Sequence, residues 1–240
     1  RRLNDFYLID KNHLYYDESG YPLEDKDLRV PIPKENLNKI KLFKGFVTDG
    51  DKLYRGKELL SGYEGEIWMK FYSMFQYFIN EDFVLNKRVK RPPDNPINAL
   101  ISFGNTLLYT KTISAIYRTH LDQRISFLHE PSEGRFSLSL DISEVFKPII
   151  VYKTIFDLVN NKRIQVAKHF EKSLNYCILN EEGREIFIEA FENRIETTFL
   201  HTKLNRKISY RTAIKLDCYK LIKNILEDKE FTPFSLKNSY

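Results

Sequence analysis

Residues 94–121, DNPINALISFGNTLLYTKTISAIYRTHL, are the stretch that decides the fold of this chain. Asp94 or Asn95 supplies a helix N-cap, and Pro96 follows in the first turn, where its missing N–H costs no hydrogen bond. The rest of the stretch is apolar on nearly every side, as shown by Leu100, Phe103, Leu107, Leu108 and Ile113. A helix that is apolar all round is buried. We therefore expect this segment to be the central buried helix of the domain.

Four further segments have the apolar spacing or the N-cap residues of helices. They are residues 64–79, a segment from Ser139 or Asp141 to about Asn160, residues 181–200 begun at Asn180, and residues 209–226 with Ser209 as N-cap. The first places five apolar side chains on one face: Ile67, Phe71, Met74, Phe75 and Phe78. Residues 57–240 are therefore predicted to form a mainly α-helical domain.

Residues 1–56 have a different pattern. Short β-type runs at 6–9, 14–16 and 28–32 are separated by turn signals, among them Asp49-Gly50. This piece is too short to bury a convincing core of its own. The predicted fold class is α+β, with a small strand-rich N-terminal piece at residues 1–56 followed by the mainly α-helical domain.

The composition bounds the function classes. Of the 240 residues, 42% are hydrophobic and 30% are charged, which is a globular balance. There is no apolar run of 18 residues and no secretory signal, so we expect no membrane span and a cytoplasmic location. Two distant cysteines, Cys177 and Cys218, fit a reducing compartment.

Thirty-eight Lys and Arg against 33 Asp and Glu give a net charge of +5, which permits nucleic-acid binding without being diagnostic of it. The densest basic segment is residues 87–91, where Lys87, Arg88, Lys90 and Arg91 precede two prolines. It is either a solvated loop or, beside a carboxylate metal site, a clamp for the phosphate backbone. A second cluster that includes Arg211 lies near the C-terminal end of the sequence and could extend such a surface.

One group of residues has the spacing of a metal site. His129 lies in a loop, and Asp141 and Glu144 follow three residues apart, so both carboxylates share one helix face. Two oxygens and an imidazole suit Mg²⁺ or Mn²⁺. The alternative is that the two acids are ordinary N-terminal helix residues favoured by the helix dipole. Glu64, with Gly62 and Gly65 on its two sides, is either a further ligand or a plain capping carboxylate.

The sequence has no glycine-rich phosphate loop, no nucleophile elbow and no HExxH or CxxC pair. Several of its longer motifs instead resemble, in register, the CRISPR-associated adaptation integrase family Cas1. They are residues 62–65 (GYEG), 90–109 (KRPPDNPINALISFGNTLLY), 127–131 (FLHEP), 136–148 (FSLSLDISEVFKP), 179–184 (LNEEGR) and 207–211 (KISYR). The resemblance covers roughly residues 58–236 and is nearest to the type I-B branch.

The resemblance implies a catalytic domain that binds Mg²⁺ or Mn²⁺ through Glu64, His129 and Glu144, with Asp141 in a supporting role. It implies a DNA endonuclease and integrase that joins the 3′-hydroxyl ends of short foreign DNA to the leader–repeat junction of a CRISPR array. The implied partners are DNA, a Cas2 dimer and a second copy of the chain. Asn98 and Tyr109 also match family motif positions, which places them near the site.

The sequence departs from the family at its N-terminal side. Only 63 residues precede Glu64, and the helices expected just upstream are not recognisable, so this is either a compact variant or a chain that omits native segments. Two alternative functions remain from the sequence. One is a catalytically idle DNA-binding or assembly subunit, and the other is a related transposon integrase.

Overall fold

The computed structural model describes residues 46–49, 52–127, 129, 136–227 and 231–235, with side chains from residue 65 onward. The chain forms two compact units. The first comprises residues 1–68 and 224–229, and the second comprises residues 69–223 and 230–240. Each unit is described by itself.

The described part of the first unit begins with a β-hairpin. Strands β1 (Phe46–Asp49) and β2 (Lys52–Arg55) pair antiparallel, and helix α2 (Gly56–Ser73) follows without a break. Residues 56–68 of α2 belong to the first unit and residues 69–73 to the second. Asp49 of the predicted turn is the last residue of β1, while Gly50 and the strands predicted at 6–9, 14–16 and 28–32 lie outside the described residues. Helix α2 begins at Gly56, next to residue 57, where the predicted α-helical domain starts, so Glu64 lies inside the helix and not just before one.

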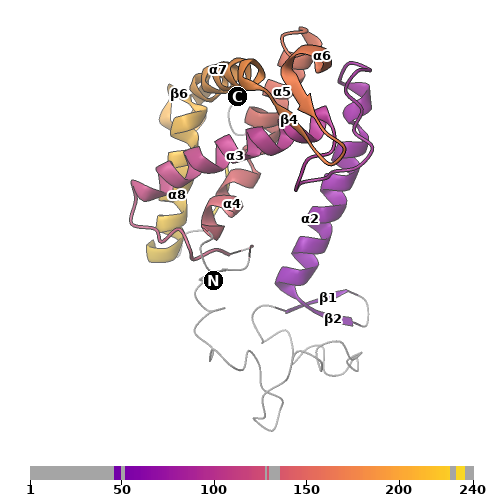
Figure 1. The fold of residues 1–240 in the computed structure, drawn as a ribbon. Helices are drawn as coiled ribbons and strands as arrows, with labels where there is room; N and C mark the ends of the chain where they lie inside the picture. Colours follow the sequence, from indigo (N-terminus) through magenta and orange to yellow (C-terminus); the bar gives the residue numbers. More distant parts are fainter. Residues whose placement is uncertain (1–45, 50–51, 128, 130–135, 228–230, 236–240) are drawn as a thin grey trace. The chain divides into compact units, whose positions relative to one another are not determined.

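Helix α3 (Pro96–Tyr117) is the centre of the second unit. The Asn95 side chain accepts a hydrogen bond from the Asn98 backbone N–H at 2.9 Å, so Asn95 is the predicted N-cap and Pro96 is the first helical residue. The core side chains of this helix are completely buried: Ile97, Leu100, Ile101, Leu108 and Ile116. Figure 1 shows α3 in magenta, with α4 (Ser137–Glu144) and β4 (Cys177–Leu179) packed beside it. The prediction of a central buried helix is confirmed.

The helix predicted from Ser139 or Asp141 to Asn160 is three consecutive segments. Helix α4 ends at Glu144, the π-helix η4 spans Lys147–Tyr152, and α5 (Lys153–Asn160) completes the run. The interruption has a chemical cause, since Pro148 has no N–H to donate to the carbonyl of Glu144 four residues earlier. The α-helical backbone therefore stops at one of the predicted site residues.

Helices α7 (Glu181–Glu196) and α8 (Tyr210–Glu227) begin where the sequence predicts. Asn180 accepts from the Gly183 N–H at 2.9 Å, and the Ser209 hydroxyl accepts from the Thr212 N–H at 3.3 Å. The helix predicted to continue to Leu200 ends at Glu196 instead. The remaining short elements are η3 (Phe75–Tyr77), α6 (Val166–His169), β3 (Phe170–Lys172), β5 (Thr198–His201), η5 (Thr202–Leu204) and β6 (Arg206–Ser209).

Strands β3 and β4 form one antiparallel hairpin, and β5 and β6 form another, so the second unit is mainly but not entirely helical. The apolar face predicted for residues 64–79 is smaller than expected. Phe75 is buried against the rings of Tyr152 and Phe156, but Ile67, Met74 and Phe78 are exposed. Met74 and Phe78 lie beyond the end of α2 at Ser73. Among the described helices, none is both long enough and apolar enough to cross a membrane.

The close packing of α3 predicts the effect of a methyl group at Gly104. A Cβ at this position would lie 2.6 Å from Val151 Cγ1 and 3.0 Å from Phe187 Cζ. We expect Gly104→Ala to lower the free energy of unfolding by about 1–3 kcal/mol through overpacking. Urea denaturation measures this loss, and Ser114→Ala on the exposed side of the same helix is the matched control, expected within about 0.5 kcal/mol of wild type. Equal stability of the two variants would contradict the packing described here.

Candidate active site

The buried carboxylate of Asp141 organises the loop that carries His129. One oxygen, Oδ2, accepts from the Phe127 backbone N–H at 2.7 Å, and the other, Oδ1, accepts from the His129 backbone N–H at 2.9 Å. The same Oδ1 lies 2.6 Å from Nδ1 of the His129 ring. Asp141 therefore fixes both the backbone and the ring of this histidine.

This contact also sets the tautomer of His129. A carboxylate only accepts hydrogen bonds, so Nδ1 carries the proton that points at Asp141. In the neutral ring the lone pair is then on Nε2, and no described residue donates a hydrogen bond to that atom. A histidine that gives one ring N–H to a carboxylate and keeps the other nitrogen available is the usual arrangement of a metal-ligating imidazole.

Glu144 lies three residues after Asp141 and is the last residue of α4. Its Oε1 contacts the Lys147 ammonium group, whereas Oε2 is buried and has no hydrogen-bond partner among the described residues. The alternative of N-terminal acids favoured by the helix dipole is wrong, because Asp141 is the fifth residue of α4 and Glu144 is the eighth. A buried carboxylate oxygen that accepts no hydrogen bond is well suited to bind a cation.

The donor set is therefore compatible with a divalent cation. His129 Nε2 and Glu144 Oε2 are both available in the second unit, and both are hard or borderline ligands. Glu64 lies in α2 within the first unit, not before a helix as predicted, and its side chain is outside the description. Within the described residues, no three His, Cys, Asp or Glu side chains gather into a metal-ligand cluster, so the predicted trio stays a prediction.

Two tyrosines that the sequence analysis did not single out border this acid. The hydroxyl groups of Tyr72 and Tyr152 are hydrogen-bonded at 2.9 Å. Burial raises the pKa of both hydroxyls, and the negative charge of Glu144 raises the pKa of both further. The two residues are 80 positions apart, so no local motif could have revealed the pair.

The basic segment at residues 87–91 does not present all of its charges to solvent. Arg88 donates to Asn98 Oδ1 at 3.0 Å and to Ser102 Oγ at 2.9 Å, and burial lowers the pKa of its guanidinium group. Lys87, Lys90 and Arg91 are exposed. The segment therefore holds one cation that supports α3 and three that face outward.

Asn98, placed near the site by the resemblance, is completely buried and anchors this segment. Its Nδ2 donates to the Lys87 carbonyl and to Asp94 Oδ1, both at 2.8 Å. Tyr109 has a comparable linking contact, because its hydroxyl donates to the Phe136 carbonyl at 3.2 Å, just before α4. Asn98 therefore holds the basic segment against α3, and Tyr109 links α3 to the residue that precedes α4.

Arg211, predicted to contact DNA, is engaged within the protein. Its guanidinium group lies 3.0 Å from Glu192 and also contacts Glu196, both on α7. The charge of Arg211 is thus largely compensated before any ligand binds.

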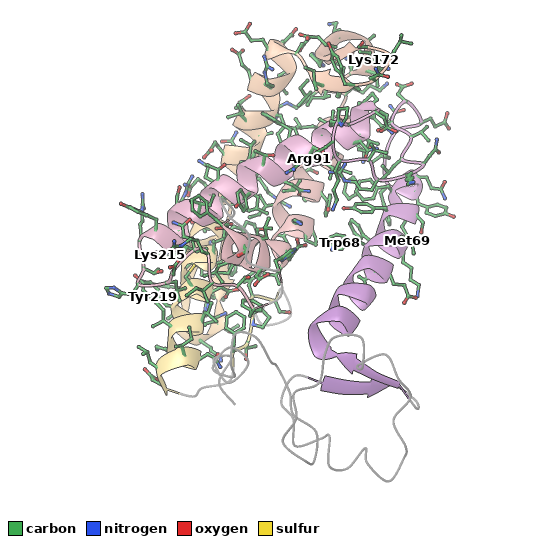
Figure 2. All side chains as sticks on the ribbon, turned by 60° about the horizontal axis from the view of Figure 1, so that its bottom comes forward. Trp68, Met69, Arg91, Lys172, Lys215 and Tyr219 are labelled. Atoms are coloured by element: carbon green, nitrogen blue, oxygen red, sulfur yellow. The ribbon has the colours of Figure 1, made fainter. Side chains whose placement is uncertain are left out.

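Farther along α8, the Lys215 ammonium group lies 5.7 Å from the ring centre of Tyr219, and Figure 2 shows these two side chains next to each other.

Comparison with known proteins identifies the family. The family described as CRISPR associated protein Cas1 matches residues 26–193. A CRISPR-associated endonuclease Cas1 of Thermodesulfovibrio yellowstonii is 50% identical over 175 residues, which are 73% of this chain and 54% of the relative. A second Cas1 from the same organism is 39% identical over 97% of this chain and 74% of its own length. The chain therefore belongs to the Cas1 family.

Solved structures agree with this assignment. A Cas1 protein from Thermotoga maritima has a TM-score of 0.66 and 45% identity, and the match covers 71% of this chain and 52% of the other. A casposase bound to an integration product shares the fold, with a TM-score of 0.70 and 22% identity over 78% of this chain and 55% of the other. The chain spans about half the length of the first curated relatives that it matches.

The three hydrogen bonds to Asp141 predict a large effect of Asp141→Asn on stability. The amide group replaces one acceptor oxygen by an NH₂ donor, so a buried N–H loses its partner, at a cost of about 1–3 kcal/mol. Chemical denaturation measures the loss. The control is Asp157→Asn, which removes an exposed pair with Lys153 and is expected to cost at most about 0.5 kcal/mol. Equal losses would show that Asp141 does not organise the loop.

Proposed function

We propose that this chain acts as a metal-dependent DNA endonuclease and integrase in CRISPR adaptation. It joins the 3′-hydroxyl ends of short foreign DNA to the leader–repeat junction of a CRISPR array. The observation that carries the proposal is the His129 ring oriented by Asp141, which lies on the same helix as Glu144 and its unpartnered buried oxygen. The family of the chain supplies the reaction class, since the two Cas1 proteins from Thermodesulfovibrio yellowstonii are named endonucleases.

Glu64, His129 and Glu144 would hold Mg²⁺ or Mn²⁺. When bound, the cation supplies polarisation of the scissile phosphate and stabilisation of the charge on the departing oxygen. Asp141 keeps the His129 ring in one tautomer and one orientation, and Lys147 offsets the charge of Glu144. The 3′-hydroxyl oxygen of the incoming strand forms the new bond to phosphorus as the old phosphorus–oxygen bond breaks. The protein therefore needs no nucleophile of its own.

The exposed cations of the basic segment would bind the phosphate backbone. Lys87, Lys90 and Arg91 have no ion-pair partner among the described residues, in contrast to Arg211. An acidic site repels DNA unless cations nearby compensate it. We therefore assign the DNA contact to these three residues, and we assign Arg88 and Arg211 to the support of the fold.

We also propose a Cas2 dimer and a second copy of this chain as partners. One solved structure with the same fold is titled a partial Cas6-RT-Cas1–Cas2 complex, with a TM-score of 0.65 and 23% identity. The casposase shares the fold equally well, so a transposon integrase is the competing function. The two functions differ in their targets: a leader and repeat in one case, and an element end with its target site in the other.

The decisive experiment is a joining assay with short duplex DNA, a plasmid with a leader and repeat, and Mg²⁺ or Mn²⁺. We expect metal-dependent joined products from wild type and a loss of at least about 100-fold in Glu64→Ala, His129→Ala and Glu144→Ala, comparable to the loss of one catalytic electrostatic group. Glu189→Ala, at an exposed position of α7, is the control. Wild type that binds DNA but joins nothing, with or without Cas2, would favour an idle assembly subunit.

The proposed DNA contact predicts that Arg91 and Arg211 contribute unequally to the salt dependence of DNA binding. Affinity should fall steeply with salt, and Arg91→Ala should reduce the slope of log K against log salt by about 0.9, the value of one lost phosphate contact. Arg211→Ala should change it much less, because Glu192 and Glu196 already compensate that charge. Fluorescence anisotropy at several salt concentrations measures both slopes. The reverse order would move the DNA contact to α8.

A further inference from the structure

A short segment near the end of the chain packs on both flanks of the candidate site. We call residues 231–235 the strap. Its first aromatic residue, Phe231, lies with its ring centre 6.1 Å from that of Phe127, and its second, Phe234, stacks on Phe146 at 5.1 Å with an angle of 17° between the rings. Phe127 is two residues before His129, and Phe146 is two residues after Glu144.

The strap is anchored by more than ring contacts. The Phe234 backbone N–H donates to Asp217 Oδ2 at 2.8 Å, and Lys220 holds the other oxygen, Oδ1, at 2.7 Å. Asp217 is only 2% exposed. Because both oxygens of this buried carboxylate accept hydrogen bonds, Asp217 holds the backbone of the strap in one position.

The ring of Phe234 also closes an aromatic cluster. It meets Phe199 edge-on at 5.4 Å and Tyr210 at 6.2 Å, while its stacked face covers Phe146. Phe146 lies between the end of α4 at Glu144 and the start of the π-helix at Lys147. Phe234 therefore stabilises the backbone next to the acid.

Phe231 acts on the opposite flank. Asp141 holds the backbone N–H groups of Phe127 and His129 from the side of α4. The ring of Phe231 packs on the side chain of Phe127, so this loop is held at two separate points. Loss of either point lowers the cost of opening the loop.

We propose that the strap positions the two ends of the active site, with Phe231 acting through Phe127 on His129 and Phe234 acting through Phe146 on Glu144. The part of this inference that concerns catalysis rests on the proposed function. The structural part, that the strap restrains the His129 loop, does not depend on it.

The structural part is tested by amide hydrogen exchange in Phe231→Ala. We expect the amides of Phe127 and His129 to exchange about three- to tenfold faster, as the loss of one aromatic pair predicts, while those of α3 stay unchanged. Phe170→Ala is the matched control, because Phe170 is also half-buried and makes one ring contact, with Phe83 at 6.0 Å. Unchanged exchange at Phe127 and His129, or an equal increase in both variants, would overturn the proposal.

A second pair of variants tests the anchor. Asp217→Leu removes the acceptor for the Phe234 N–H and should reproduce the faster exchange, whereas Asp217→Asn keeps an acceptor oxygen and should not. Faster exchange in neither variant, or to the same degree in both, would overturn the role of the anchor.

The catalytic part is tested by the joining assay. Phe231→Ala should lower kcat about three- to tenfold with the KM for DNA unchanged, because the strap positions the site without touching the substrate, and Phe231→Tyr should restore kcat by restoring the ring. A raised KM with unchanged kcat would overturn it. If wild type joins no DNA, the proposed function fails, and the exchange measurements still decide whether the strap restrains the loop.

Discussion

The rest of the candidate site depends on one buried carboxylate, that of Asp141. Its two oxygens accept two backbone N–H groups and one ring N–H, so a single side chain of α4 fixes the loop, the ring and the tautomer of His129. Asp141 is only 5% exposed, and burying a carboxylate this deeply costs free energy unless hydrogen bonds replace its contacts with water. The same carboxylate therefore holds the backbone at His129 in place and orients the ring of this histidine.

Much of the fold could be predicted from local signals. The N-caps Asn95, Asn180 and Ser209 mark the starts of α3, α7 and α8, because capping depends on residues within one turn. The predictions failed where distant contacts or backbone chemistry intervene. The apolar spacing predicts one helix from Ser139 or Asp141 to Asn160, but Pro148 lacks an N–H, and a π-helix follows the end of α4 at Glu144.

The candidate site shows the same difference between local signals, which the sequence reveals, and contacts between distant segments, which it does not. The spacing of Asp141 and Glu144 is sufficient to place both on one helix face, and the residue pattern already groups His129 with them. The resemblance assigns the ligand roles. Charge counting could not show that Arg88 turns toward Asn98 and that Arg211 pairs with α7, since those partners come from other elements. The Tyr72–Tyr152 pair could not be predicted from the sequence for the same reason. Solvent exposure, which decides whether a cation can bind phosphate, is a property of the folded chain.

The chain contains an internal standard for a buried carboxylate with a structural role. Asp217 is 2% exposed, and both of its oxygens accept hydrogen bonds, from Lys220 and from the Phe234 backbone. Glu144 differs: among the described residues, its Oε2 is the carboxylate oxygen that is buried without such a partner, a cost of about 1–3 kcal/mol for an unsatisfied polar group. Natural proteins accept local costs of this kind mainly at functional sites. The contrast between these two acids, more than the identity of either, supports the proposal that Glu144 serves a ligand.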